Sequence, residues 1–366
     1  MIRILHVVTD MNRGGLETMI MNYYRCIDRS KIQFDFLTHR EYDGDYGEEI
    51  ISLGGKIYHL PILNPFSPLY RKALANFFDK HPEYKIIHVH QDCMSSVILK
   101  EARKHDVPVR IAHSHNSNQD KNLRYVIKLF YMRLIPKYAT KLFACSEEAG
   151  RWMFQDASFE VLRNAIASDK YVYCADKRKT YREMLGVEDN EVLFGHVGRF
   201  YEQKNHRFLL DVFNCAKELV RSKIIFVGIG PLQQEIRQRA LSLGIQDKVI
   251  FAGLRSDVAD VLQAMDLFVF PSLYEGLGIV AIEAQASGLP CLISDTIPDD
   301  CMLTDLIEKK SLSDGAESWA KRAVELSKKP RRNTYEEIKS AGFDINENAK
   351  KLSDFYTMQW EEKCRY

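Results

Sequence analysis

Short apolar runs alternate along this chain with longer amphipathic stretches, and this alternation limits the possible folds more than any other feature. Apolar runs that look like strands lie at 2–8, 33–39, 85–91, 109–115 and 141–146, and again at 192–199, 223–230, 248–254, 267–272 and 290–294. Each is followed by a stretch with helical periodicity, about 10–15 residues long. The pattern predicts βαβ units and therefore parallel sheets.

The alternation occurs twice, and a polar, irregular stretch around 164–190 separates the two series. A chain of 366 residues has a suitable length for two domains. We therefore expect an α/β fold with two Rossmann-like, doubly wound parallel-sheet domains. The first domain is expected at 1–165, a linker at 166–189, and the second domain at 190–345.

Composition excludes several classes of protein. The formal net charge of +1 gives no reason to expect a nucleic-acid partner. The eight cysteines include no CxxC pair, which favours reduced thiols over disulfides or a zinc site. The start, MIRILHVVTD, is typical of a strand rather than a signal peptide, and no apolar run reaches the roughly 18 residues of a membrane span. We expect a cytoplasmic protein.

Three loops that follow strands in the second half carry residues suited to a phosphorylated ligand. Parallel sheets bind ligands outside the carboxyl ends of their strands. The residues concerned are Arg199 and Lys204 after the strand 192–198, Gly228 and Gly230 at the end of the run 223–230, and Gly276 and Gly278 before a helix that starts near Ile279. The amides and the dipole at that helix start favour an anion.

Two glutamates belong to the last of these loops and its helix. At a rise of about 1.5 Å per residue, Glu275 and Glu283 should lie on the order of 10 Å apart. A retaining glycosidase needs its carboxyl groups about 5–5.5 Å apart, so this pair does not fit that role. Taken singly, each charge is typical of a solvated surface. Together with the glycines and the cations, they indicate a site for a nucleotide-sugar, with its diphosphate at the helix start and its hydroxyls held by the two acids.

The segment YEGLGIVAIEAQASGLP (274–290) resembles the E-x7-E signature of the retaining glycosyltransferases with two Rossmann-like domains facing a cleft, the GT-B fold. That group includes many bacterial capsule and exopolysaccharide enzymes. The segment GRFYEQKN (198–205) resembles the family's diphosphate-binding segment. The segments VGIGP (227–231) and FAGLRSDV (251–258) resemble its base-binding strand ends.

The resemblance implies a retaining, metal-independent transfer of a sugar from a nucleoside-diphosphate sugar, with UDP as the most frequent nucleotide of the family. It assigns catalytic roles to His113, Arg199, Lys204 and Glu275. It assigns donor binding to Gly14, Gly15, Gly228, Leu254, Arg255, Gly276, Leu277, Gly278 and Glu283, with Glu283 on the ribose and Leu254 and Arg255 near the base. It also implies no cofactor, a glycan or lipid-linked acceptor, and a C-terminal helix, 346–366, that completes the first domain.

In the first half, Gly14 and Gly15 follow the first strand and precede a helix. They are not part of a GxGxxG sequence, so the dinucleotide fingerprint of a dehydrogenase is absent. An ordinary strand-to-helix turn would also explain them. The resemblance implies that this loop faces the cleft and touches the donor phosphate or the acceptor.

Histidines occur in pairs with a spacing of two at the ends of two strands, His88 with His90 and His113 with His115. Four histidines raise the possibility of zinc, but no acid or thiol completes a ligand spacing, so we expect no metal. Hydrogen-bonded packing explains His88 and His90. The resemblance implies a histidine near the reacting carbon of the donor, and His113, followed by Asn116, fits best, with His115 as the alternative.

Two charged segments have competing interpretations. Asp43–Asp45, DGD, has the spacing of a metal-binding motif, but its polar loop favours a turn. The segment 121–141 carries six basic residues and no acid among apolar and aromatic residues. It is typical of a basic amphipathic helix on an anionic membrane, or of a core helix with a solvated basic face. The membrane interpretation places the enzyme at the inner face of the membrane.

Two other functions fit the same architecture. A nucleotide-sugar epimerase would act on the donor without an acceptor. A non-catalytic protein that binds sugar nucleotides would bind the donor without turnover, although Arg199, Lys204, Glu275 and Glu283 argue against this.

Overall fold

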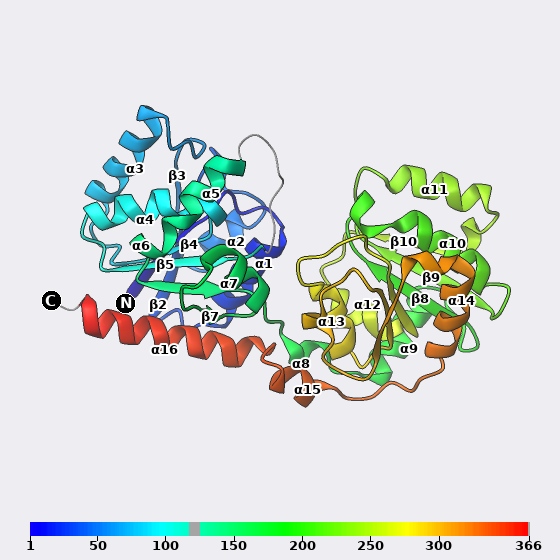
Figure 1. Cartoon of the computed structure of the whole chain (residues 1–366). Coiled ribbons are helices and arrows are strands. Elements are labelled where there is room, and N and C mark those ends of the chain that lie inside the picture. The colour runs from blue at the N-terminus through cyan, green and yellow to red at the C-terminus, as the bar shows by residue number, and fades with distance from the viewer. Residues whose placement is uncertain (117–124, 365–366) are drawn as a thin grey trace. The chain divides into compact units, whose positions relative to one another are not determined.

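The computed structural model describes residues 1–116 and 125–364, and the chain forms two compact units (Figure 1). The first unit comprises Met1–Ile166 and Asp344–Tyr366, and the second comprises Ala167–Phe343. Each unit contains one sheet in which the described strands all pair in parallel. The predicted pair of doubly wound parallel sheets is therefore confirmed.

The seven-stranded sheet of the first unit has the order β3-β2-β1-β4-β5-β6-β7. Its strands are β1 (Ile2–Val7), β2 (Ile32–Thr38), β3 (Ile57–His59), β4 (Ile86–Val89), β5 (Val109–Ser114), β6 (Lys141–Ala144) and β7 (Glu160–Val161). The chain moves outward from β1 in one direction and from β4 in the other. The strand order therefore reverses between β1 and β4, which pair with His6 opposite His88.

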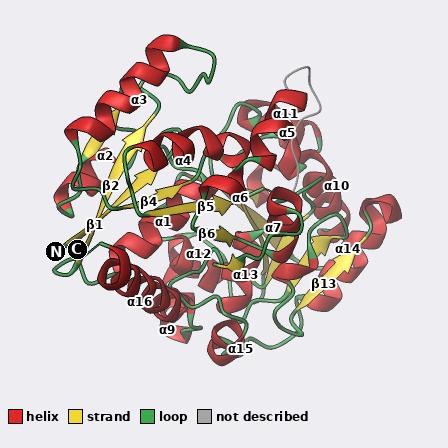
Figure 2. Ribbon diagram, turned by 60° about the vertical axis from the view of Figure 1, so that its left-hand side comes forward, coloured by secondary structure: helices red, strands yellow, loops and turns green. Residues whose placement is uncertain are grey.

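Helices cover both faces of this sheet. The helices of the first unit are α1 (Gly15–Cys26), α2 (Gly47–Ser52), α3 (Pro68–Lys80), α4 (Ser95–Lys104), α5 (Tyr125–Arg133), α6 (Ile135–Tyr138), α7 (Glu147–Phe154) and α16 (Ile345–Lys363). Figure 2 shows α3 and α4 on one side of the strands and α16 on the other. Because side chains alternate along a strand, Val7 and Val89 face the apolar cluster of α3 and α4, whereas His88 faces Tyr356 of α16.

The six-stranded sheet of the second unit has the order β10-β9-β8-β11-β12-β13. Its strands are β8 (Val192–Val197), β9 (Ser222–Val227), β10 (Val249–Gly253), β11 (Leu267–Phe270), β12 (Cys291–Ser294) and β13 (Ile307–Lys310). Its helices are α8 (Ser168–Tyr171), α9 (Ala175–Met184), α10 (His206–Ala216), α11 (Gln233–Ser242), α12 (Val258–Ala264), α13 (Ile279–Ala286), α14 (Gly315–Leu326) and α15 (Tyr335–Ser340).

The segment 166–189, expected as a linker, is folded. It forms α8 and α9, and α9 packs on α12 of the second unit. Arg178 and Arg182 of α9 both form ion pairs with Asp266, which immediately precedes β11. Part of the polar composition that suggested a linker therefore belongs to α9, in which Arg178 and Arg182 are paired rather than solvated.

Candidate functional site

The second sheet reverses its strand order between β8 and β11, which are neighbours. β9 and β10 follow on the side of β8, and β12 and β13 follow on the side of β11. Such a reversal leaves a crevice at the carboxyl ends of the two strands, where doubly wound folds bind ligands. The loops that leave β8 and β11 contain six of the predicted site residues: Arg199, Lys204, Glu275, Gly276, Leu277 and Gly278.

A short ion pair connects these two loops. Lys204 Nζ lies 2.6 Å from Glu275 Oε1, and the two side chains are only 17% and 9% exposed. Lys204 also lies over the ring of Phe270, 4.9 Å from its centroid. The structure thus brings together two predicted site residues that are 71 positions apart in the sequence.

Backbone contacts hold the same loops in place. The amide of Leu273 donates to the carbonyl of Gln203, and the side chain of Gln203 donates to the carbonyl of Tyr274. The loop after β9 also approaches the loop after β8. Gly228 has a φ of +137°, and a Cβ there would lie 2.2 Å from the carbonyl oxygen of Gly198. Glycine is therefore required at 228 because two loops meet there, a stronger reason than the sharp turn that the sequence suggests.

The loop after β11 leads into α13. Gly278, at φ +78°, is the N-cap of this helix, and among the described residues no side chain caps it and no acid occupies its first turn. A Cβ at Gly276 would meet nothing within 4 Å. The helix α13 thus begins without a capping side chain from the described part of the chain, and open space lies beside the backbone two residues earlier, at Gly276. An uncapped helix start suits an anion.

Glu283 lies within α13 and is partly buried. Burial raises its pKa to about 7, and a hydrogen bond from Tyr171 of α8 opposes that rise. The same contacts raise the pKa of the Tyr171 hydroxyl well above its usual value, with burial as the larger cause. Tyr171 was not among the predicted site residues, because it lies in the segment interpreted as a linker and no local pattern distinguishes it.

The remaining predicted residues of this unit lie at neighbouring strand ends. Arg199 directly follows the Gly198 that Gly228 contacts, and its side chain is exposed. Leu254, 61% exposed, and Arg255 follow β10. The guanidinium of Arg255 pairs with Asp257, which in turn accepts a hydrogen bond from Tyr181. Leu277, in contrast, is nearly buried.

In the first unit, Gly14 is the N-cap of α1 with an ordinary φ of −125°. A Cβ at Gly15 would meet nothing within 4 Å, so neither backbone conformation nor packing requires this glycine. The DGD segment, predicted to be a turn, lies in the loop before α2, where the amide of Gly47 donates to the carbonyl of Gly44. Asp43 accepts a hydrogen bond from His59, and Asp45 accepts one from the amide of Arg13.

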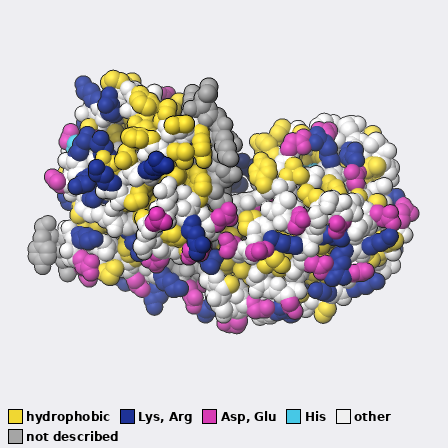
Figure 3. Space-filling view, in the orientation of Figure 1, with side chains coloured by type: hydrophobic (Ala, Val, Ile, Leu, Met, Phe, Trp, Pro, Cys, Tyr) yellow, Lys and Arg dark blue, Asp and Glu magenta, His cyan; other side chains and the backbone are white. Residues whose placement is uncertain are grey.

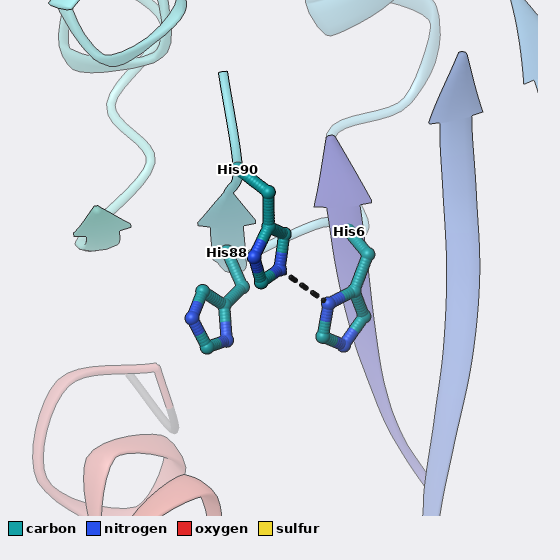
Figure 4. A group of neighbouring side chains, drawn as sticks. All are labelled: His6, His88 and His90. Atoms are coloured by element: carbon teal, nitrogen blue, oxygen red, sulfur yellow. Dashed lines mark hydrogen bonds between the residues drawn. The ribbon is translucent and has the colours of Figure 1, made fainter. Parts of the chain in front are cut away.

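Five histidines of the first unit form a layer on one face of the sheet, and Figure 4 shows three of them, His6, His88 and His90. His113 is only 1% exposed within β5, whereas His115 lies beyond the strand end and is partly exposed. Two groups, His6 with His88 and His90, and His90 with His113 and His115, have ring nitrogens close enough to be considered for a metal ion. The prediction that the enzyme needs no metal remains a prediction.

The described part of the basic segment 121–141 contains α5 and α6 and ends at Lys141, the first residue of β6, while Lys121 and Arg124 lie outside the described residues. Val126 and Phe130 of α5 are 73% and 60% exposed, and Phe66 and Leu69, near the start of α3, are 63% and 70% exposed. Phe66 contacts Tyr131 of α5. Figure 3 shows hydrophobic side chains gathered on this part of the first unit, with Lys and Arg side chains beside them. Among the described helices, none combines the length and apolar content that a membrane crossing requires.

Known families match both halves of the chain. "Glycosyltransferase Family 4" matches residues 13–169, and "Glycosyl transferases group 1" matches residues 177–342. The putative glycosyltransferase EpsF of Bacillus subtilis is 38% identical over 98% of this chain and 97% of that protein. The capsular polysaccharide biosynthesis glycosyltransferase CapH of Staphylococcus aureus is 25% identical over 97% of this chain and 99% of that protein.

Solved structures share the same arrangement of strands and helices. The structure of HepE from Anabaena in complex with UDP aligns with a TM-score of 0.81 at 17% identity, and the alignment covers 98% of this chain and 100% of that one. WaaG, a glycosyltransferase of lipopolysaccharide biosynthesis, aligns with a TM-score of 0.68 over 96% of this chain and 95% of its own. At these identities the likeness establishes the fold alone.

Proposed function

The chain belongs to the group 1 glycosyltransferases of the bacterial capsular and exopolysaccharide type, with the GT-B fold, and from that premise we propose its donor and its stereochemistry. The donor is a UDP-sugar, and the sugar passes to a hydroxyl of a glycan or lipid-linked acceptor with retention of configuration. The UDP bound by the structural neighbour HepE supports this choice of nucleotide.

One observation carries the proposal. Lys204 and Glu275 meet at the reversal of the second sheet, beside the uncapped start of α13. As the glycosidic bond breaks, negative charge grows on the leaving diphosphate, and fixed cationic and amide groups stabilise it most effectively in a site with little water. Without ligand, Glu275 neutralises Lys204. A bound diphosphate would replace Glu275 as the ion-pair partner of Lys204. Glu275 would then accept hydrogen bonds from the donor sugar.

The chemistry proposed for this site needs no protein nucleophile and no metal. Arg199, Lys204 and the amides of α13 supply the positive charge that a metal ion provides in other transferases. The bond between the anomeric carbon and the phosphate oxygen breaks while the acceptor oxygen approaches from the same face. The phosphate oxygen then takes the acceptor proton, which leaves UDP and the glycosylated acceptor as products.

Calorimetry with UDP tests the donor assignment. Wild-type protein should bind UDP, and Glu283→Ala should weaken binding at least ten-fold, the loss of about 1.4 kcal/mol that a charge-assisted hydrogen bond to ribose implies. An unchanged dissociation constant would contradict the ribose role of Glu283. Incubation with UDP-sugar alone distinguishes an epimerase, because only an epimerase would convert the sugar without an acceptor.

We further propose that the exposed apolar side chains of α5 and the start of α3 contact the cytoplasmic face of the membrane, where a lipid-linked acceptor is found. Apolar side chains enter the interface while nearby lysines and arginines meet anionic headgroups. Vesicles containing anionic lipid should sediment the protein, and Val126→Ser together with Phe130→Ser should reduce sedimentation. Equal sedimentation with purely zwitterionic vesicles would contradict the proposed contact between the basic side chains and anionic headgroups.

A further inference from the structure

Three histidines of the buried layer form a continuous hydrogen-bonded chain in the first unit. His6 Nδ1 lies 3.0 Å from His90 Nε2, and His90 Nδ1 lies 2.9 Å from His115 Nε2. His6 and His90 are 2% and 4% exposed, and their rings are inclined by only 15°, so that the two nitrogens face each other (Figure 4). Burial holds the pKa of His6 and that of His115 near 3, so these imidazoles are neutral.

The number of protons in this chain restricts it to two states. A neutral imidazole has one N–H group and one acceptor nitrogen. Three such rings with two connecting hydrogen bonds use two N–H groups between them, and the third N–H lies at one end. In the first state that N–H is on His115 Nδ1, and in the second it is on His6 Nε2. Neither end nitrogen has a hydrogen-bond partner among the described residues.

The two states give His115 different chemistry toward a ligand. In the first state His115 Nδ1 donates a hydrogen bond, and in the second it offers a lone pair. A buried nitrogen without a partner costs free energy, which a ligand hydroxyl could recover. His115 lies at the carboxyl end of β5, the edge of the sheet where parallel folds bind ligands. Next to it, the Asn116 side chain donates to Asp92, which follows β4 with a φ of +44°.

We propose that His90 and His6 are positioning residues, which set the tautomer that His115 Nδ1 presents to a sugar hydroxyl. The inference rests on the proposed function, since the hydroxyl belongs to its donor or acceptor. The rings of His113 and His115 are in contact, with centroids 4.1 Å apart and planes tilted by 34°, but in the described structure no hydrogen bond joins His113 to the chain of histidines. The chain does not act as a proton sink, because a net proton would have to rest on a deeply buried imidazole.

The proximity of these rings could also suggest a metal site, but their geometry argues against it. Two nitrogen ligands of one zinc ion need lone pairs that converge on the metal. The facing nitrogens of His6 and His90 instead point at each other across 3.0 Å, the distance of an N–H···N hydrogen bond. The third ring of that group belongs to His88, and its Nδ1 is already hydrogen-bonded to the hydroxyl of Tyr356, at 2.7 Å.

The test combines histidine NMR with kinetics on the full chain. Nitrogen chemical shifts of ¹⁵N-labelled histidines should show His115 and His6 of the wild type in the linked neutral tautomers of one of the two states. His90→Leu should give a mixture of tautomers and lower kcat about five-fold, the effect of one net hydrogen bond, with the donor KM unchanged. His90→Asn, which keeps a polar atom near the position of Nδ1, should restore part of kcat. His88→Phe, in the same layer but outside the chain, should leave the His115 tautomer unchanged.

Three results would overturn the inference. The first is an unchanged His115 tautomer in His90→Leu. The second is an unchanged kcat in that variant. The third is a melting temperature that zinc raises in the wild type but not in His90→Leu, which would make the cluster a metal site. A failure of the proposed function looks different, because the wild type would then not bind UDP by calorimetry while the tautomer coupling among the histidines persisted.

Discussion

Single side chains of the second unit are proposed to carry the chemistry of the donor site, and Lys204 is one of them. Its ammonium group is held between the carboxylate of Glu275 and the ring of Phe270. Nearly all of its side chain is buried, so its charge acts at short range and with little screening by water.

Replacing Lys204 therefore tests the stabilisation of the leaving diphosphate. Lys204→Ala should lower kcat about 10²–10³-fold, as the loss of a preorganised group at a developing anion does. Turnover of UDP-sugar measures the effect, and circular dichroism checks the fold. Lys321→Ala is the matched control, because Lys321 forms an exposed ion pair with Glu317 on α14. Equal loss of activity in both variants would mean a general effect on stability.

The raised pKa of Glu283 makes donor binding depend on pH. The carboxylate form, which in the proposed role accepts hydrogen bonds from both ribose hydroxyls, predominates only above the pKa of about 7. Affinity for UDP should therefore rise as the pH increases from 6 to 8. Glu283→Gln should bind more weakly and lack this component, and the ratio of the two dissociation constants cancels the ionisation of UDP itself. A ratio that stays constant with pH would contradict the prediction.

At the scale of elements, the loops after β8 and β9 approach each other closely, and the proposed donor site is expected to depend on this contact. Gly228→Ala would force a Cβ to within 2.2 Å of the Gly198 carbonyl oxygen, in a backbone conformation that only glycine adopts easily. We expect the loop to shift, UDP affinity to fall, and the free energy of unfolding to decrease by about 1–3 kcal/mol.

Gly186→Ala separates backbone strain from the clash. Gly186 also has a positive φ, +64°, but a Cβ there would meet nothing within 4 Å. Gly186→Ala should lower the free energy of unfolding by only about 1 kcal/mol and leave UDP affinity unchanged. Chemical denaturation and calorimetry on both variants measure the difference. If Gly228→Ala binds UDP as well as Gly186→Ala does, the contact between the two loops does not support the donor site.

At the scale of the whole molecule, the stability of the first unit depends on the C-terminal helix α16. Tyr356 of α16 is fully buried, and its hydroxyl lies 2.7 Å from His88 Nδ1, 268 positions away. Tyr356→Ala should destabilise the first unit by about 3–5 kcal/mol, as large-to-small changes in a core do. Tyr356→Phe should lower the free energy of unfolding by only about 1 kcal/mol, because it removes one hydrogen bond and keeps the ring.

Limited proteolysis with and without UDP shows which unit is destabilised in Tyr356→Ala. Cleavage should increase within residues 1–166, while UDP still protects the second unit. Loss of UDP binding in Tyr356→Ala would show that the two units do not fold as separately as their internal packing indicates.

The sequence by itself determined the two parallel sheets and predicted the loops that are proposed to hold the donor. Alternation of apolar runs and amphipathic stretches is a local property, and ligand residues of parallel sheets follow their strands directly. Only the tertiary structure decided which distant side chains meet: Lys204 with Glu275, Glu283 with Tyr171, and His115 with His90 and His6. Periodicity shows which face a residue occupies, but strand order and helix packing decide what lies opposite, and those depend on the whole chain.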